Sequence, residues 1–270
     1  MAAGGTPKKA GSAIPPKKIM VFGILGSLIG IYAGHFLTIM FGPVFSFLGV
    51  LGAICAIVWG ADTVRRVCSY GIGTGVPSIG MLAIGMGIVA ALFGLEIGGI
   101  AGPVVALVIA TIIGLIIGLL GNRIMKMGVP IMETATAEIA AAGTLTIVGV
   151  STSMAGSFEI YNIVSHVVAN GFIALVFIIG AIAILHPFNS NLGPDEKQDR
   201  TLAVAFVDGS IVMIVTGIVV AGVSIASAVP TLVIGLLIWI IAFTKYYSLV
   251  KRDAYKVVGT GLLPTEEELS

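Results

Sequence analysis

Long apolar stretches alternate with short polar connections along almost the whole chain. A helix that crosses the hydrocarbon core of a membrane needs about 20 mostly apolar residues. The stretch 202–243 is 42 residues long, too long for one crossing, and it becomes less apolar at 221–230, so we divide it there. The pattern predicts an all-α fold, a polytopic membrane helix bundle of about eight spans: 19–40, 44–60, 79–95, 100–120, 131–155, 163–185 and the two parts of 202–243.

The positive charges test this division, because Lys and Arg concentrate in cytoplasmic loops. All 14 basic residues fall on one side of the eight-span topology, whereas the loops near Gly42, Glu96, Glu159 and Ser227 on the other side carry none. An odd number of spans would scatter these charges over both sides. We therefore expect both chain termini in the cytoplasm. The basic residues are Lys8, Lys9, Lys17, Lys18, Arg65, Arg66, Arg123, Lys126, Lys197, Arg200, Lys245, Lys251, Arg252 and Lys256.

Composition excludes most other classes of protein. The 270 residues are 57 % apolar and 10 % charged, with a mean hydropathy of +1.12, against about 25 % charged residues in soluble domains. A net charge of +1 excludes a strongly charged nucleic-acid binder, and the apolar content excludes a disordered chain. We expect a multi-pass protein of the cell membrane, with a cytoplasmic tail at 1–18, a transmembrane domain at 19–244 that includes a polar cytoplasmic loop at 186–201, and a cytoplasmic tail at 245–270.

Small residues recur every four positions on three of the predicted spans. This spacing lets helix backbones approach closely, which replaces the hydrophobic driving force between helices in lipid. Two interpretations stay open: the stripes form the core of a tightly packed bundle, or they form a surface for other subunits. The three stripes are Gly26, Gly30 and Gly34; Ala83, Gly87 and Ala91; and Ala110, Gly114 and Gly118.

A glycine-rich segment at 68–80 separates the second and third spans. Its glycines do not match the dinucleotide-binding fingerprint, which needs a preceding strand and a different spacing. Irregular backbone near membrane depth persists only where protein or a water-filled cavity covers it. The segment is therefore either a surface turn or a re-entrant loop, in which Gly71, Gly73, Gly75 and Pro77 would line a cytoplasmic vestibule.

Acidic residues inside membrane spans are costly and indicate ion pathways. Asp208 lies six residues beyond the start of the seventh span and Glu138 a similar distance into the fifth, with Thr134 one turn earlier on the same face. Their oxygen atoms suit a sodium ion or a proton relay, which makes these three residues candidates for a cation path. The alternative is that both carboxylates are simply solvated at the level of the lipid headgroups.

The polar segment between the sixth and seventh spans contains a Gly-Pro turn signal. We interpret it as a solvated platform on which Asp195, Glu196, Lys197 and Arg200 dock a cytoplasmic domain or another subunit. The three histidines lack a metal ligand at useful spacing, and we interpret them as structural. Motifs for a nucleophile, a zinc ion or a bound phosphate do not occur. We therefore expect no catalytic residue, no metal site and no directly bound cofactor in this chain.

Two stretches carry a resemblance to a known family. They are VWGADTVRRVCSYGIGTGVPSIG at 58–80 and HPFNSNLGPDEKQDRTL at 186–202. Both resemble the C subunit of the tetrahydromethanopterin S-methyltransferase of methanogenic archaea, and the likeness in hydropathy extends from about residue 14 onward. The second stretch is specific, because membrane composition alone rarely produces such a polar run.

The resemblance implies a subunit of a sodium-translocating complex. That complex moves a methyl group from methyl-tetrahydromethanopterin to coenzyme M through a corrinoid on another subunit. It implies three partners, the membrane subunits D and E and the corrinoid-carrying A subunit, with membrane lipids around the chain and no nucleic acid. Sodium is the candidate ion. A stand-alone secondary transporter or channel is the alternative, as is a purely structural scaffold for sodium-conducting subunits.

Overall fold

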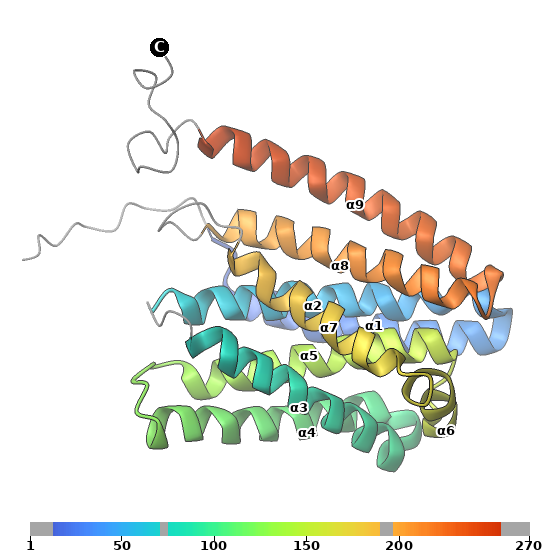
Figure 1. The fold of residues 1–270 in the computed structure, drawn as a ribbon, viewed down its shortest axis with the longest axis horizontal. Helices are drawn as coiled ribbons and strands as arrows, with labels where there is room; N and C mark the ends of the chain where they lie inside the picture. The colour runs from blue at the N-terminus through green and yellow to red at the C-terminus, as the bar shows by residue number, and fades with distance from the viewer. Residues whose placement is uncertain (1–12, 71–74, 190–196, 255–270) are drawn as a thin grey trace, which may run out of the picture.

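The computed structural model describes residues 13–70, 75–189 and 197–254, and within them every regular element is helical (Figure 1). In chain order the elements are α1 (Pro16–Phe41), the 3₁₀ turn η1 (Pro43–Ser46), α2 (Phe47–Cys68), α3 (Gly75–Gly98), the 3₁₀ turn η2 (Gly99–Ala101), α4 (Gly102–Leu119), the π-helical turn η3 (Leu120–Ile124), α5 (Met132–Ala155), α6 (Ile160–Ile163), the π-helical turn η4 (Val164–Val168), α7 (Phe172–Asn189), α8 (Gln198–Ala221) and α9 (Ile225–Ala254).

The described helices account for eight membrane crossings. Six stretches are long and apolar enough to span a membrane, and a bent pair of helices adds a seventh. One of the six, Ser78–Ile124, has 47 residues. At about 1.5 Å per residue it would reach roughly 70 Å, more than twice the hydrocarbon thickness. It consists of α3 and α4, which pack side by side (Figure 1), so it counts as two crossings. The predicted all-α bundle of about eight spans is confirmed.

The division of the stretch 202–243 is also confirmed, since α8 ends at Ala221 and α9 begins at Ile225. The sixth span, predicted at 163–185, consists of two helical parts that are bent against each other. Its first part, Ile160–Val168, is bent by 86° against α7. Gly171 adopts a left-handed φ of 76° at the corner. The amide nitrogen of the Asn170 side chain donates to the carbonyl oxygens of Ser165 and His166, at 3.2 and 3.3 Å, which satisfies the end of the first part.

The centre of the bundle is α5, which packs against α1, α2, α3, α4 and α7 (Figure 1). Of its apolar window, 89 % is buried inside the chain, whereas α1 and α9 are each only 28 % buried. Its sequence explains this position, because Ala, Gly, Ser and Thr dominate it and let neighbouring helices come close. The outer helices turn their large apolar side chains outward, as a lipid environment requires.

The three stripes of small residues all serve packing within this chain, so the interpretation as a bundle core holds. On α1, a Cβ added to Gly30 would lie 2.7 Å from backbone atoms of Gly52 in α2. On α3, one added to Gly87 would lie 2.9 Å from the hydroxyl of Thr144 in α5. On α4, one added to Gly114 would lie 2.5 Å from backbone atoms at the Thr136–Ala137 junction of α5.

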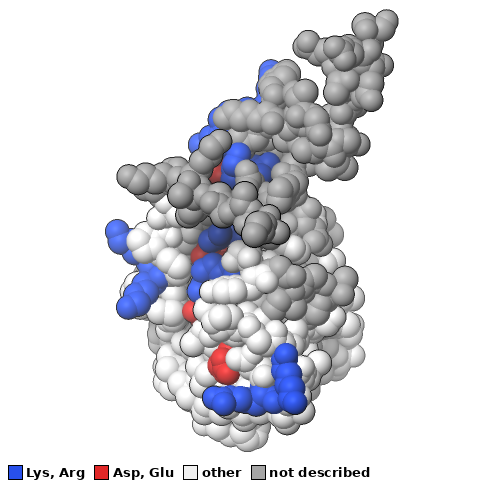
Figure 2. Space-filling model, turned by 90° about the vertical axis from the view of Figure 1, so that its left-hand side faces the viewer, with Lys and Arg blue, Asp and Glu red and all other residues white. Residues whose placement is uncertain are grey.

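Charged side chains gather at one end of the bundle, which we call the charged end. There α1, α3, α5 and α8 begin and α2, α4, α7 and α9 end. Figure 2 looks onto this end and shows Lys and Arg side chains around a few acidic ones. The opposite end is called the far end below. The concentration of Lys and Arg at one end of the bundle agrees with the predicted topology. The cytoplasmic location of this end stays a prediction.

The contact between α1 and α2 gives a direct test of the packing. We expect Gly30→Ala to destabilise the protein by about 1–3 kcal/mol, because the new methyl group would push against helix backbone that cannot yield. Gly85→Ala is the matched control, since a Cβ there would meet only the Phe177 ring at 3.9 Å. Both variants gain the same helix propensity. The thermal unfolding midpoint in detergent measures the difference, and equal midpoints would contradict the close contact.

Candidate functional site

The last turns of α2 carry polar side chains at helical spacing. Trp59, Asp62, Thr63 and Arg66 follow one another one to four residues apart and share one side of the helix, with Arg65 beside them. This side meets α5 and α8 at the charged end. Asp62 is only 1 % exposed and Thr63 is fully buried. The charge of Asp62 depends on protein partners, because almost none of its side chain is accessible to water.

Glu138 of α5 is held by this side of α2. Its Oε2 atom accepts a hydrogen bond from Trp59 Nε1 at 3.1 Å and one from Thr63 Oγ1 at 2.8 Å. It also accepts a hydrogen bond from Nη2 of Arg66, with which it forms an ion pair. Arg66 and Glu138 side chains are each 19 % exposed. Three donors on one oxygen fix the carboxylate, and the guanidinium matches its charge.

Asp62 forms the second half of the network. Its Oδ1 atom accepts hydrogen bonds from Nη2 and Nε of Arg65, at 2.9 and 3.1 Å, and one from Nε2 of Gln198 at 3.1 Å. Arg66 Nε lies 3.5 Å from Asp62 Oδ2, an ion pair without hydrogen-bond geometry. The Gln198 amide also exchanges two hydrogen bonds with the backbone of Ile14. Two arginines and two carboxylates thus join α2, α5, α8 and the chain before α1 into one electrically neutral network.

This geometry changes the picture of Glu138 as a cation-path candidate. The sequence places no obvious counter-charge near it, but the fold brings Arg66 from α2 against it. A cation at Glu138 would compete with a guanidinium that stays charged under all ordinary conditions. Thr134, the predicted companion, is exposed, and its hydroxyl donates to the carbonyl oxygen of Ile131 at 3.1 Å. The structure does not join Thr134 to the network around Glu138.

Asp208 has a different environment. It lies ten residues after the start of α8, which is about 15 Å along the helix axis, and its side chain is 11 % exposed. His186, near the end of α7, places its Nδ1 atom 2.8 Å from Asp208 Oδ2. The sequence favours a structural role for His186 and offers no basic residue in the span of Asp208. The signal that was missed is that α7 and α8 are consecutive helices, so the end of one meets the other.

The remaining predicted residues lie at the charged end or outside the described residues. Gly71 and Gly73 of the glycine-rich segment, and Asp195 and Glu196 of the polar segment, lie outside them. Gly75 and Pro77 belong to the first turn of α3, so from residue 75 onward the segment is helix and not loop. Lys197 is the residue that precedes α8.

Arg200 requires a correction. We expected its guanidinium on a solvated platform, ready to dock another subunit. Arg200 instead lies in the first turn of α8, and it is only 2 % exposed, the largest of the fully buried side chains. A helix that starts at Gln198 turns this position into the bundle, which a loop would not do. Within the described residues, Lys197 is the one docking candidate that keeps an accessible side chain.

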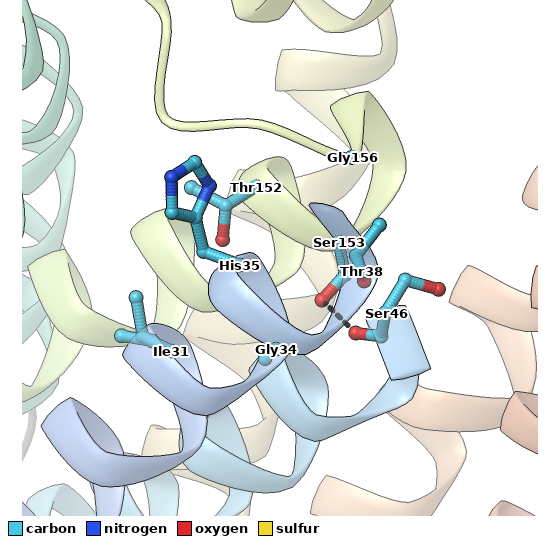
Figure 3. A pocket seen from close by; sticks show the side chains of 9 residues that line it. Ile31, Gly34, His35, Thr38, Ser46, Thr152, Ser153 and Gly156 are labelled. Atoms are coloured by element: carbon cyan, nitrogen blue, oxygen red, sulfur yellow. Dashed lines mark hydrogen bonds between the residues drawn. The ribbon is translucent and has the colours of Figure 1, made fainter. Parts of the chain in front are cut away.

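A second polar site lies at the far end, between α1, α2 and α5 (Figure 3). It is a cavity of about 10 Å³, roughly the size that one water molecule needs. The His35 Nδ1 and Thr38 Oγ1 atoms, both from residues that line it, are buried and have no hydrogen-bond partner within the described residues. Ser153 Oγ donates to the carbonyl oxygen of Ser46 at 2.7 Å across the same site (Figure 3). The cavity offers polar partners for a single small molecule and is too small for a cofactor.

Neither site gathers the ligands of a metal ion. Within residues 13–70, 75–189 and 197–254, no three side chains of His, Cys, Asp or Glu come together. The chemistry that the two sites support is therefore ion pairing at the charged end and hydrogen bonding to a small polar molecule at the far end. The pair of Asp208 and His186 belongs to neither site and brings one acid and one imidazole into contact.

Comparison with known proteins gives a consistent result. Residues 1–267 match the protein family of the C subunit of tetrahydromethanopterin S-methyltransferase. The chain is 58 % identical over 270 residues to the protein of that name from Methanosarcina barkeri, with 100 % of both chains covered. It is 48 % identical over 272 residues to the one from Methanothermobacter marburgensis, with 99 % of each covered. For the one from Methanocaldococcus jannaschii, identity is 35 % over 265 residues, covering 96 % of this chain and 97 % of the relative.

The ion pair between Arg66 and Glu138 predicts a particular pattern of stabilities. We expect Glu138→Leu or Arg66→Met alone to cost roughly 1–3 kcal/mol, because each leaves the other charge uncompensated and partly buried. The double variant should recover most of that loss, since both charges are gone. Arg123→Met, at an exposed position, is the control and should change little. Unfolding midpoints of the wild type, the two single variants and the double variant provide the double-mutant cycle. A loss in the double variant equal to the sum of the two single losses would contradict the pair.

Proposed function

Because the chain belongs to the family of the C subunit of tetrahydromethanopterin S-methyltransferase, we propose that it forms part of the membrane portion of a sodium-translocating methyltransferase complex. In this proposal the complex transfers a methyl group from methyl-tetrahydromethanopterin to coenzyme M. The corrinoid that carries the methyl group is held by a different chain, the A subunit. Membrane subunits D and E are the neighbours of this chain, in the cytoplasmic membrane.

One observation carries the proposal: the match to the family extends over residues 1–267, and all of the chain aligns with the Methanosarcina barkeri relative. The architecture supports a membrane role, because the described helices are long and apolar enough for about eight crossings and turn large apolar side chains outward. The arginines and carboxylates at the charged end bind one another. This supports a structural role for the chain, with the methyl-transfer chemistry on other subunits.

For the ion, we propose Asp208 as the stronger candidate of the two acids in this chain. Its hydrogen-bond partner within the described residues is one histidine, His186, whose Nδ1 atom lies 2.8 Å away. Glu138 is held by an arginine and two further donors. A carboxylate within a span that lacks a permanent counter-charge is the arrangement that ion pathways use. Thr134 remains a weaker candidate because its hydroxyl is bonded to the backbone.

Purification of the native assembly tests the proposal. A tag on this chain, with extraction of the membranes in mild detergent, should recover a large complex that contains a corrinoid protein and transfers methyl groups to coenzyme M. The physical reason is that membrane subunits pack through extensive helix contacts that mild detergent preserves. Migration of the tagged chain as a monomer, with no corrinoid absorbance in the recovered fraction, would show that the complex does not include it.

The role of Asp208 has its own test in that complex. Asp208→Asn keeps the shape of the side chain and removes its charge, so methyl transfer should need roughly tenfold more sodium for half-maximal rate, a loss of about 1.4 kcal/mol in ion binding. Asp199→Asn on the same helix is the control. Asp199 is 46 % exposed and pairs with Arg252 at 3.2 Å at the charged end, so its neutralisation should leave the sodium dependence unchanged. An Asp208→Asn complex with wild-type sodium dependence would exclude Asp208 from the path.

A further inference from the structure

A pocket of about 360 Å³ opens between α1 and α4 on the outside of the bundle. Met20 and Ile24 of α1 form one wall, and Val108 and Ile112 of α4 form the other. Two alanines of α5 form the floor, and their small side chains leave the space. A volume of this size is typical of a site for a ligand or a large side chain.

One polar group that lines the pocket has a hydrogen-bond acceptor without a donor from the described residues. Glu138, which lines the pocket, takes all three of its hydrogen bonds on Oε2. Within the described residues its Oε1 atom accepts none. The hydroxyl of Thr111, which also lines the pocket, donates to the carbonyl oxygen of Leu107 at 2.8 Å. Glu138 thus brings to an otherwise apolar space a carboxylate whose second oxygen has no donor within the described residues.

The depth of this oxygen makes a donor necessary. Glu138 lies six residues after the start of α5, about 9 Å along the helix, and the exposed apolar side chains of Val108 and Ile112 stand beside it, each 53 % exposed. Exposed apolar side chains of this kind suit lipid hydrocarbon or another subunit. An unsatisfied polar atom in hydrocarbon costs several kcal/mol, so the occupant of the pocket should bring a hydrogen-bond donor.

The chemistry of the pocket selects among occupants. A lipid tail would fill it but carries no donor, and a single water molecule would leave most of the 360 Å³ empty. A lysine or arginine would bring a charge, yet Asp62, Glu138, Arg65 and Arg66 already cancel one another. The remaining fit is a large, neutral, mostly apolar side chain with one donor, which describes tyrosine and tryptophan.

We propose that a tyrosine or tryptophan on a transmembrane helix of a different subunit fills this pocket and donates a hydrogen bond to Oε1 of Glu138. The inference rests on the proposed function, because it needs a neighbouring membrane subunit. It assigns the α1–α4 side as a subunit interface. The network at the charged end then has a second role, since Arg66, Thr63 and Trp59 hold Glu138 in the position that receives the partner.

Photo-crosslinking in the assembled complex tests the assignment. A photoreactive phenylalanine replaces Val108 in the full chain, and membranes are illuminated before extraction. We expect crosslinked peptides from a transmembrane segment of another subunit of the complex, close to a tyrosine or tryptophan. The matched control places the same amino acid at Leu237, which is similarly exposed at 55 % but lies on α9, at the opposite edge of the bundle from α4 (Figure 1). The control should not yield that peptide.

Substitution of the crosslinked aromatic residue by Phe completes the test. Phe keeps an aromatic ring, that of tyrosine unchanged and a smaller one in place of an indole, and removes the donor, so detergent extraction should retain the partner about tenfold less well. Crosslinks only to lipid or to a second copy of this chain, a peptide without tyrosine or tryptophan, or unchanged retention would each overturn the inference. Recovery of the corrinoid protein with the unmodified chain is scored separately. If the complex is recovered but Val108 does not reach another subunit, the inference fails and the proposed function stands.

Discussion

The close approach of α2 to α1 and to α5 is the constraint on which the rest of the structure depends. Lipid supplies no hydrophobic drive between helices, so they must meet backbone to backbone. A Cβ on Gly52 would lie 2.6 Å from the carbonyl oxygen of Ser27 in α1, and one on Gly49 would lie 2.9 Å from that of Gly149 in α5. No larger side chain fits at either contact. These contacts place everything that α2 carries at its charged end, including the arginine that reaches Glu138.

The central position of α5 inverts the rule for soluble proteins, in which the most apolar helix is the most buried. Among the six apolar stretches, α5 has the lowest mean hydropathy and the largest buried share. Several of its hydroxyl groups avoid the cost of burial because they bond to the preceding turn, as Thr146 does to the carbonyl oxygen of Ala142 and Thr152 to that of Val148. Large apolar side chains are needed where lipid is the neighbour, and small ones where another helix is.

Local patterns in the sequence were sufficient for the helices and insufficient for the pairs between them. The length of the apolar runs and the side on which Lys and Arg fall predict the spans and the charged end. The sequence analysis did not single out Asp62. A local signal for it existed, since Arg65 and Arg66 follow it three and four residues later, at the spacing of ion pairs on a helix. The contact of Arg66 with Glu138 joins residues 72 apart and depends on how α2 and α5 are rotated against each other, which no local pattern contains. The prediction of a solvated Arg200 was wrong for a related reason, since the burial of this side chain depends on where α8 begins.

Two acids that look alike in the sequence, Glu138 and Asp208, differ in the partners that the fold gives them. Glu138 accepts three donors from one rigid helix, and one of them is a guanidinium that cannot give up its charge. Asp208 meets one imidazole, whose side chain is 51 % exposed at the end of α7. A cation that approaches Glu138 must displace a permanent charge and compete with two further donors, whereas one that approaches Asp208 meets a single hydrogen-bond partner within the described residues. Depth in the membrane is therefore not what distinguishes a structural carboxylate from one that can bind and release an ion; the chemistry of its nearest partner is.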